Sequence, residues 1–241
     1  MPTTEQWLAL GLIGVYLFDA MYFLRVGDAV VETSGRALKR VNFGWPFELG
    51  GRQPFLPNLL TPFQPAFRIE WDLAGGAVAD AGSASQEMQG VLAALRPIRW
   101  TSSACGLLIV LAAPVCLLLA EQVWFLGVVA TSVLVALLGC IIVIVRRKAL
   151  GLDAKQLISI CFVALICLPC SANLARAVAG NRRWILAARD LPRLGFEPAD
   201  AMTTCRLTVT ALSNAKRYVA QESREFQVID EQIRLLGECN T

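Results

Sequence analysis

Two cysteines stand at a spacing that permits redox chemistry. Cys167 and Cys170 form a CxxC sequence at the end of an apolar stretch. Two thiols at this spacing can bridge, and the attacking thiol of such a pair has a lowered pKa. One hypothesis is therefore a membrane thiol-disulfide oxidoreductase. The interpretation we favour is that both cysteines are inert and serve as small hydrophobic residues. The same is expected of the cysteines in the other apolar stretches, which are Cys105, Cys116, Cys140 and Cys161.

The general layout is similar to that of four-helix membrane thiol oxidoreductases that reduce quinones and place a CxxC close to a bilayer edge. The resemblance implies a second cysteine pair on an exposed loop, which relays electrons. Residues 26–100 contain no cysteine, so the sequence departs from that pattern. Cys205 and Cys239 supply a second pair only if the C-terminal tail lies outside and folds back, because one continuous helix would hold them beyond disulfide reach.

Asp19 is a carboxylate inside an apolar stretch, where a buried charge must be paired, neutralised or hydrated. One hypothesis is a proton or ion site, and hence a small transporter or channel subunit. The interpretation we favour is structural, because one acid without a second membrane carboxylate makes a poor relay. Asp19 then lies near the headgroups or pairs with Asn173 or Arg176, the other polar residues predicted within the membrane.

Several function classes are excluded by composition. The 241 residues include no histidine, which removes Ser-His-Asp hydrolysis, zincin chemistry and haem ligation by histidine. The sequence lacks both GxGxxG and GxxxxGK[ST], so no glycine loop for phosphate is predicted. A net charge of +3 is too small to indicate nucleic acid. We therefore expect no cofactor and no metal site, and we favour a protein without enzymatic activity.

The apolar residues are concentrated in blocks that fit a bilayer. Hydrophobic residues make up 56% of the chain, and the mean hydropathy is +0.54. Membrane spans are predicted over residues 7–24, 104–120 and 123–145, the last two as an antiparallel hairpin. Residues 157–175 form an ambiguous fourth segment, which either crosses or is re-entrant. The opening residues carry no Lys or Arg, so the first block is predicted to be an anchor that is retained.

Basic residues predict the orientation, because Lys and Arg in short loops stay cytoplasmic. They follow the first and third spans and precede the second, which places the N-terminus outside and the large loop inside. Five arginines beyond the fourth segment disagree with a true crossing: Arg176, Arg182, Arg183, Arg189 and Arg193. Either that segment is re-entrant and the tail is cytoplasmic, or the tail has been translocated. Inversion of the whole chain is the third alternative.

The first loop contains patterns typical of strands. Phe67, Ile69, Trp71 and Leu73 alternate with polar residues, which predicts a strand with one apolar face. The same alternation predicts a strand over residues 41–45, and a weaker pattern predicts a third over residues 29–33, and hence a small antiparallel sheet. Prolines predict an ordered extended loop over residues 55–63. After a linker over residues 75–83, Ser83 and Gln86 can form the capping box of a short helix, whose apolar stripe is Met88, Val91, Leu92 and Leu95.

The C-terminal tail has the most regular pattern outside the membrane. Apolar residues spaced by threes and fours form a heptad seam over residues 199–236, which predicts one long amphipathic helix or two. The seam either packs within this chain or contacts a second copy or another protein, through Leu212, Val219, Phe226, Ile229, Ile233 and Leu236. A basic stretch before it is predicted to bind lipid headgroups, through Arg182, Arg183, Trp184 and Arg189.

The predicted fold is membrane α-helical, with three to four transmembrane helices, a small antiparallel β region in the first loop and a long amphipathic C-terminal helix. Its segments are a first transmembrane helix (1–25), a surface loop domain (26–103), a hairpin plus fourth apolar segment (104–175) and a basic segment with a helical tail (176–241). The charge pattern and the absence of an organellar presequence favour a bacterial inner membrane. The function expected first is a structural or assembly subunit of an envelope complex, whose partners are the lipid bilayer and, through the tail, another protein or a second copy of this chain.

Overall fold

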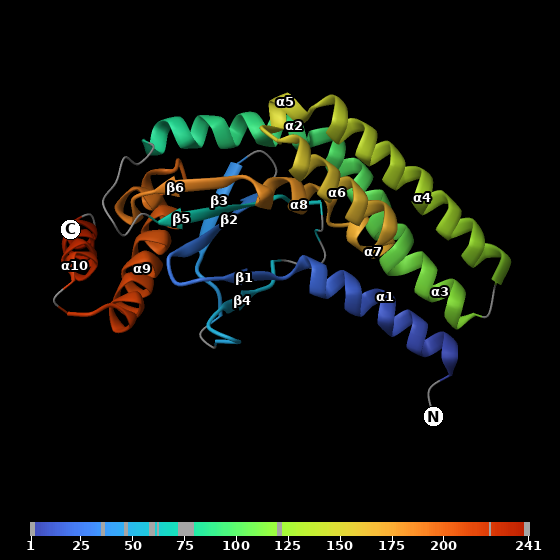
Figure 1. Ribbon diagram of the computed structural model, residues 1–241, viewed down its shortest axis with the longest axis horizontal. Helices are drawn as coiled ribbons and strands as arrows, with labels where there is room; N and C mark the ends of the chain where they lie inside the picture. Colours follow the sequence, from blue (N-terminus) through green and yellow to red (C-terminus); the bar gives the residue numbers. More distant parts are fainter. Residues whose placement is uncertain are drawn as a thin grey trace. The chain divides into compact units, whose positions relative to one another are not determined.

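The computed structural model describes residues 3–34, 37–45, 48–57, 61, 63–71, 80–119, 122–221 and 223–238. These residues are mostly helical, with a small sheet (Figure 1). They form two compact units, each built from separate stretches of the chain. Unit 1 contains Met1–Met21, Pro57–Pro65 and Val91–Arg182, and unit 2 contains Tyr22–Leu56, Ala66–Gly90 and Arg183–Thr241.

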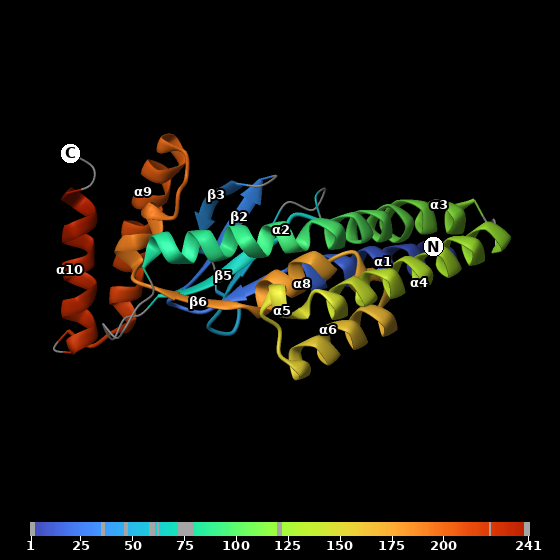
Figure 2. The same ribbon diagram turned by 90° about the horizontal axis from the view of Figure 1, so that it is seen from above.

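Unit 1 consists of apolar helices. They are α1 (Thr4–Ala20), the part of α2 (Ala81–Gly106) that follows Gly90, the π-helix η1 (Leu107–Ala112), α3 (Ala113–Leu118), α4 (Gln122–Val145), α5 (Arg147–Leu150), α6 (Ala154–Ile166), α7 (Leu168–Ser171) and α8 (Leu174–Asn181). Within the described residues, two helices are long and apolar enough to cross a bilayer, namely Ala81–Leu118 and Gln122–Val145. The predicted hairpin is confirmed, because α3 and α4 lie side by side (Figures 1 and 2).

The other predicted spans need correction. The first was predicted to reach Leu24, but α1 ends at Ala20, because Tyr22–Leu24 forms a strand that pairs with Gln53–Phe55. The second is the end of a continuous helix that begins at Ala81. Its π-helical stretch directly precedes Pro114, whose ring and missing N–H disturb the regular helix ladder.

The fourth apolar segment contains only a short helix. α6 has 13 residues, which gives a length of about 20 Å. The hydrocarbon core of a bilayer is about 30 Å thick. The chain leaves the helix at Cys167 and continues in the two short helices α7 and α8. No single helix of this segment is therefore long enough to cross.

The core of unit 1 is made of small side chains around one tyrosine. Tyr16, Cys105, Ala136 and Ala172 form a buried cluster that joins α1, α2, α4 and the turn after α7. Small residues allow helix backbones to approach closely, which is the usual packing between helices in membranes. The cluster ties the first half of the chain to the fourth apolar segment.

Gly139 provides a second close contact, where α4 meets α8. A Cβ atom at this position would lie 2.8 Å from Cδ2 of Leu174 and 3.1 Å from Oγ1 of Thr101. Gly127, on the same helix, has no such neighbour within 4 Å. The absence of a side chain at Gly139 is therefore a packing requirement of this contact.

Unit 2 combines a sheet with the C-terminal helices. Its elements are β1 (Tyr22–Leu24), β2 (Asp28–Ser34), β3 (Ala37–Asn42), β4 (Gln53–Phe55), β5 (Ala66–Trp71), the start of α2, β6 (Arg183–Leu186), η2 (Ala188–Arg193), α9 (Pro198–Ala215), η3 (Lys216–Tyr218) and α10 (Arg224–Glu238). The main sheet has the order β3-β2-β5-β6. β2 is antiparallel to β3 and β5, whereas β5 and β6 are parallel.

The predicted antiparallel strands are confirmed, with shifted ends. Phe67, Ile69 and Trp71 of β5 are buried, as their alternation predicts, and residues 72 and 73 lie outside the described part. The strand predicted over residues 41–45 ends at Asn42. Gly44 follows with a φ of +93°, and a Cβ atom there would lie 2.7 Å from Cβ of Gln53, so the chain turns away.

β6 was missed in the sequence, because its alternation is short and flanked by arginines. Trp184 was predicted to contact lipid headgroups, but it is 6% exposed and packs edge-on against Phe67, 6.3 Å between ring centroids. This prediction is wrong for Trp184. Arg183 and Arg189 are exposed, and Arg183 lies 4.0 Å from Glu70, while the Arg182 side chain packs close to Gly151.

The helix predicted after the linker begins earlier than expected. α2 begins at Ala81, and Oδ2 of Asp80 accepts hydrogen bonds from the backbone N–H groups of Gly82 and Ser83. The cap is therefore Asp80, and the predicted capping box of Ser83 and Gln86 is wrong. The predicted stripe is buried, as expected: Met88, Val91, Leu92 and Leu95. The linker itself falls mostly outside the described residues.

The tail forms two helices, as in the second predicted alternative. α9 and α10 pack side by side (Figure 2), and Nζ of Lys216 donates to Asp230 at 2.5 Å and lies over the Phe226 ring. The seam residues Leu212, Ile229 and Leu236 are buried within this chain, and Val219, Phe226 and Ile233 are partly buried. The seam is thus largely covered without a partner.

Candidate functional site

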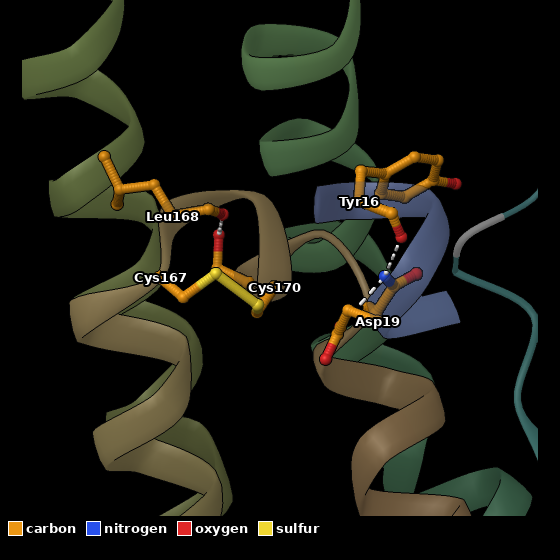
Figure 3. The surroundings of a disulfide bond; sticks show 7 residues. Tyr16, Asp19, Cys167, Leu168 and Cys170 are labelled. Carbon is orange, nitrogen blue, oxygen red and sulfur yellow. Dashed lines mark hydrogen bonds between the residues drawn. A yellow bond between two sulfur atoms is a disulfide. The ribbon is translucent and has the colours of Figure 1, made fainter. Parts of the chain in front are cut away.

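The candidate site is a disulfide in unit 1. Cys167 and Cys170 are bonded to each other, with their Cα atoms 5.3 Å apart, as the CxxC spacing permits. Figure 3 shows the bond between the end of α6 and the short helix α7, with Tyr16 and Asp19 of α1 close by. Cys167 is partly exposed and Cys170 is buried. Cys167 is therefore the sulfur that a partner molecule reaches more easily.

The local sequence explains the sharp turn at the disulfide. Pro169 has no N–H and disfavours helical backbone in the residue before it, and Cys167 has left the helix with φ −110° and ψ 89°. The turn is then closed by two hydrogen bonds. The N–H of Cys170 donates to the Cys167 carbonyl at 2.9 Å, and the Ser171 hydroxyl donates to the Leu168 carbonyl at 2.6 Å.

A small cavity of mixed lining borders the disulfide. Its volume is about 110 Å³, and its walls include Asp19 from α1, Ser159 from α6, Cys170 from α7 and Asn181 from α8, together with apolar residues of α6 and α8. Residues with a carboxylate, a hydroxyl and an amide thus line the same space as one cysteine of the disulfide. Such groups can hold water or accept and return protons when thiols form and disappear.

Asp19 is held by an asparagine. Nδ2 of Asn173 donates to Oδ2 of Asp19 at 3.0 Å and to the Tyr16 carbonyl at 3.2 Å (Figure 3). Asn173 itself is buried. The predicted pairing of Asp19 with Asn173 is confirmed, so this carboxylate has a role in packing α1 against the segment that carries the disulfide.

Arg176 lies nearby but binds a different part of the chain. Its Nη2 donates to the Thr61 carbonyl at 2.8 Å, and its Nε donates to the Gln64 carbonyl at 3.3 Å. The side chain is 3% exposed. Arg176 therefore fastens the loop Pro57–Pro65 to the helices of unit 1, a role that the sequence did not indicate.

The remaining cysteines are less scattered than the sequence suggested. Sγ of Cys140 lies 3.8 Å from the Cys161 carbonyl, so these two residues of α4 and α6 are neighbours. In unit 2, Sγ of Cys205 lies 3.5 Å from the Leu236 carbonyl, because α10 folds back along α9. This is the fold-back that a second pair requires, although Cys239 lies outside the described residues.

Comparison with known proteins gives no matching family model, no similar curated protein and no similar solved structure. The function therefore has to be argued from the chemistry of the site. Within the described part of the chain, no three side chains of the kinds that bind metals converge. The disulfide lies among apolar helices and beside a cavity that contains polar groups. Such a disulfide can exchange two electrons with thiols or with another two-electron carrier.

Proposed function

We propose that the chain is a membrane protein with three spans, formed by α1, the end of α2 with η1 and α3, and α4. The proposal is supported by apolar side chains that no protein atoms cover. On α4, Trp124 is 70% exposed, Leu134 66% and Val145 77%. The core helix of a water-soluble protein would bury such side chains, whereas lipid covers them in a membrane protein.

The sheet of unit 2 supports a re-entrant fourth segment. β5 precedes the second span and β6 follows α8, yet the two strands pair along Arg68–Trp71 and Arg183–Leu186. Strands of one sheet must lie on the same side of a bilayer, because an open sheet edge is not stable inside lipid. The chain then enters the membrane along α6, turns at the disulfide and returns. This topology places the arginines after the segment on the same side as the large loop.

This topology is tested by labelling single cysteines in a cysteine-free chain with a membrane-impermeant maleimide. Lys39→Cys in β3 and Gln227→Cys in α10 are expected to react from the same side of sealed vesicles, and Gln122→Cys from the opposite side. All three side chains are exposed in the structure. Reaction of Lys39→Cys and Gln227→Cys from opposite sides would contradict the re-entrant segment.

The function that the site supports best is thiol-disulfide oxidoreduction by Cys167 and Cys170. The observation that supports this function is the bond between the two sulfurs at the turn of the fourth segment, beside the cavity that Asp19 lines. On the proposed topology the pair lies within the membrane, about 20 Å along α6 from its start. A redox partner that meets it there must be soluble in lipid, which favours a quinone over a water-soluble protein.

The reaction balances with a quinone as the oxidant. The reduced pair gives up two electrons and two protons as its S–S bond forms, and the quinone takes them up to become a quinol. A dithiol substrate reduces the pair again: its thiolate attacks Cys167, a mixed disulfide forms, and its second thiol releases the substrate as a disulfide. Cys170 leaves toward the cavity, where Asp19 and the polar groups around it can return a proton.

The expected role as an assembly subunit has less support. It rested on a helical seam that needed a partner, and this chain buries Leu212, Ile229 and Leu236 of that seam. The transporter hypothesis rested on Asp19, which has a packing partner in Asn173.

The redox function is tested with the full chain in lipid vesicles. The pair is reduced with dithiothreitol, the reductant is removed without air, and decylubiquinone is added. We expect two thiols to be lost and one quinol to form per chain, as measured by maleimide mass shift and quinone absorbance. Cys167→Ser and Cys170→Ser should each abolish the loss of thiols and the formation of quinol. Cys161→Ser, in α6, should abolish neither.

Two outcomes would overturn the redox function. One is oxidation no faster with decylubiquinone than without it. The other is quinol formation that persists in Cys167→Ser. A pair that dithiothreitol cannot reduce, even after detergent opens the vesicles, would also rule out a redox role and leave the disulfide as a crosslink.

A further inference from the structure

A second cavity lies in unit 2, away from the cysteines. It has a volume of about 290 Å³ and is enclosed by the ends of strands on one side and by α9 with η3 on the other. Pockets for small molecules begin at about 300 Å³. The cavity is close to this lower limit, which suits a small ligand of one or two rings.

Two donors in the wall of this cavity lack hydrogen-bond partners. They are Nε1 of Trp71, at the end of β5, and Nδ2 of Asn42, at the end of β3. Trp71 is 5% exposed, so bulk water has little access to its side chain. Buried donors are nearly always paired, and leaving one unpaired is unfavourable. Two such donors in one wall indicate a ligand that brings acceptor oxygens.

The charge around the cavity favours a negative ligand. Arg25 belongs to the lining. Asp28 is the one acidic residue among the described residues of the lining, and its charge is already paired: it forms an ion pair with Arg68 and accepts the backbone N–H of Arg25 at 2.9 Å. The Tyr218 hydroxyl donates to Glu48 at 2.5 Å, which raises the pKa of Tyr218 and keeps the Tyr218 side chain neutral.

Aromatic side chains supply the apolar part of the lining. Phe43 and Trp71 pack edge to face, with ring centroids 5.3 Å apart, and Trp45 also lines the cavity while remaining 37% exposed. Flat apolar surfaces of this kind bind rings by offset or edge-to-face contact. An exposed tryptophan at a cavity rim is also a typical contact for a ligand.

We propose that this cavity binds a small aromatic carboxylate, whose oxygens accept hydrogen bonds from Trp71 and Asn42 near Arg25 and whose ring lies against Phe43 and Trp45. The site is independent of the proposed redox function, because it shares no residue with the disulfide and its cavity. It would make unit 2 a ligand-binding part of the protein.

The test uses 2-naphthoate as the probe and the full chain in lipid nanodiscs, with binding followed by saturation-transfer NMR. We expect saturable binding of 2-naphthoate. The amide 2-naphthamide and the cation 2-naphthylmethylamine, which carry the same rings, are expected to bind at least about 5-fold more weakly, because hydrogen bonds to a charged acceptor are the stronger ones.

Three variants connect the binding to the cavity. Trp71→Phe keeps a ring but removes the N–H, and is expected to weaken 2-naphthoate binding about 10-fold. Arg25→Gln, at an exposed position, is expected to weaken it about 3-fold and to reduce its salt dependence. Trp124→Phe, on an exposed face of unit 1, should bind as the parent does and so controls for partition into lipid.

The proposal is overturned if 2-naphthoate does not bind saturably, or if the amine binds as tightly as the carboxylate. It is also overturned if Arg25→Gln and Trp71→Phe both bind like the parent chain. Because Arg25→Gln changes an exposed side chain, its result stays decisive even where Trp71→Phe fails to fold.

Discussion

Gly139→Val is expected to destabilise unit 1 by about 2 to 3 kcal/mol, the range seen when a side chain is forced into a filled space. The first added carbon already lies 2.8 Å from Leu174 and 3.1 Å from Thr101. A β-branched side chain cannot rotate both of its methyl groups out of this contact. The result would be a lower apparent melting temperature in detergent, measured by size-exclusion chromatography after heating.

Gly127→Val is the matched control, since it makes the same change on the same helix. Nothing lies within 4 Å of a Cβ atom at Gly127, so the melting temperature should stay close to that of the parent. Equal losses in both variants would mean that valine disturbs the helix itself, and the close contact of α4 with Leu174 would then not be the cause.

Arg176→Met is expected to destabilise the chain by about 3 kcal/mol, because hydrogen bonds from a charged donor are strong. The methionine fills a similar volume but donates nothing to the carbonyls of Thr61 and Gln64. The loop Pro57–Pro65 should then detach. Limited proteolysis in detergent should show faster cleavage within that loop, together with a lower melting temperature.

Arg176→Lys tests whether the charge of the arginine side chain is sufficient or whether its shape is also needed. A lysine keeps the charge but lacks the planar fork that reaches two carbonyls at once, so its stability should fall between those of the parent and Arg176→Met. Arg183→Met is the control for loss of an arginine. Its side chain is 65% exposed, 4.0 Å from Glu70, and such pairs contribute little. A loop that resists protease in Arg176→Met would show that other contacts hold it.

The sequence was most informative where a signal is local. The α4 helix was predicted to within one residue, because 24 residues of almost unbroken apolar sequence leave few alternatives. β5 was identified from its alternating pattern. The CxxC spacing permitted the disulfide, but the interpretation favoured from the sequence, two inert thiols, was wrong. In each case the residues that decide the structure are close together in the chain.

The sequence was least informative where distant segments meet. β6 needs β5 as its partner, and α1 stops at Ala20 because β4 pairs with the residues that follow. The seam of the tail was predicted, but its spacing does not tell an internal contact from an external one. Likewise, Asn42 and Trp71 are ordinary strand residues until the fold places both in one wall, so no motif could have indicated that cavity.

Because β5 pairs with β6, which comes much later in the chain, the main sheet can be completed only after β6 has been synthesised. About 110 residues separate the two strands, and a ribosome that adds about 5 to 20 residues per second needs on the order of 10 s to make them. During that time β5 has one edge without its partner. Nascent chains that are released early would therefore carry an open strand edge, which is the kind of surface that chaperones and proteases recognise.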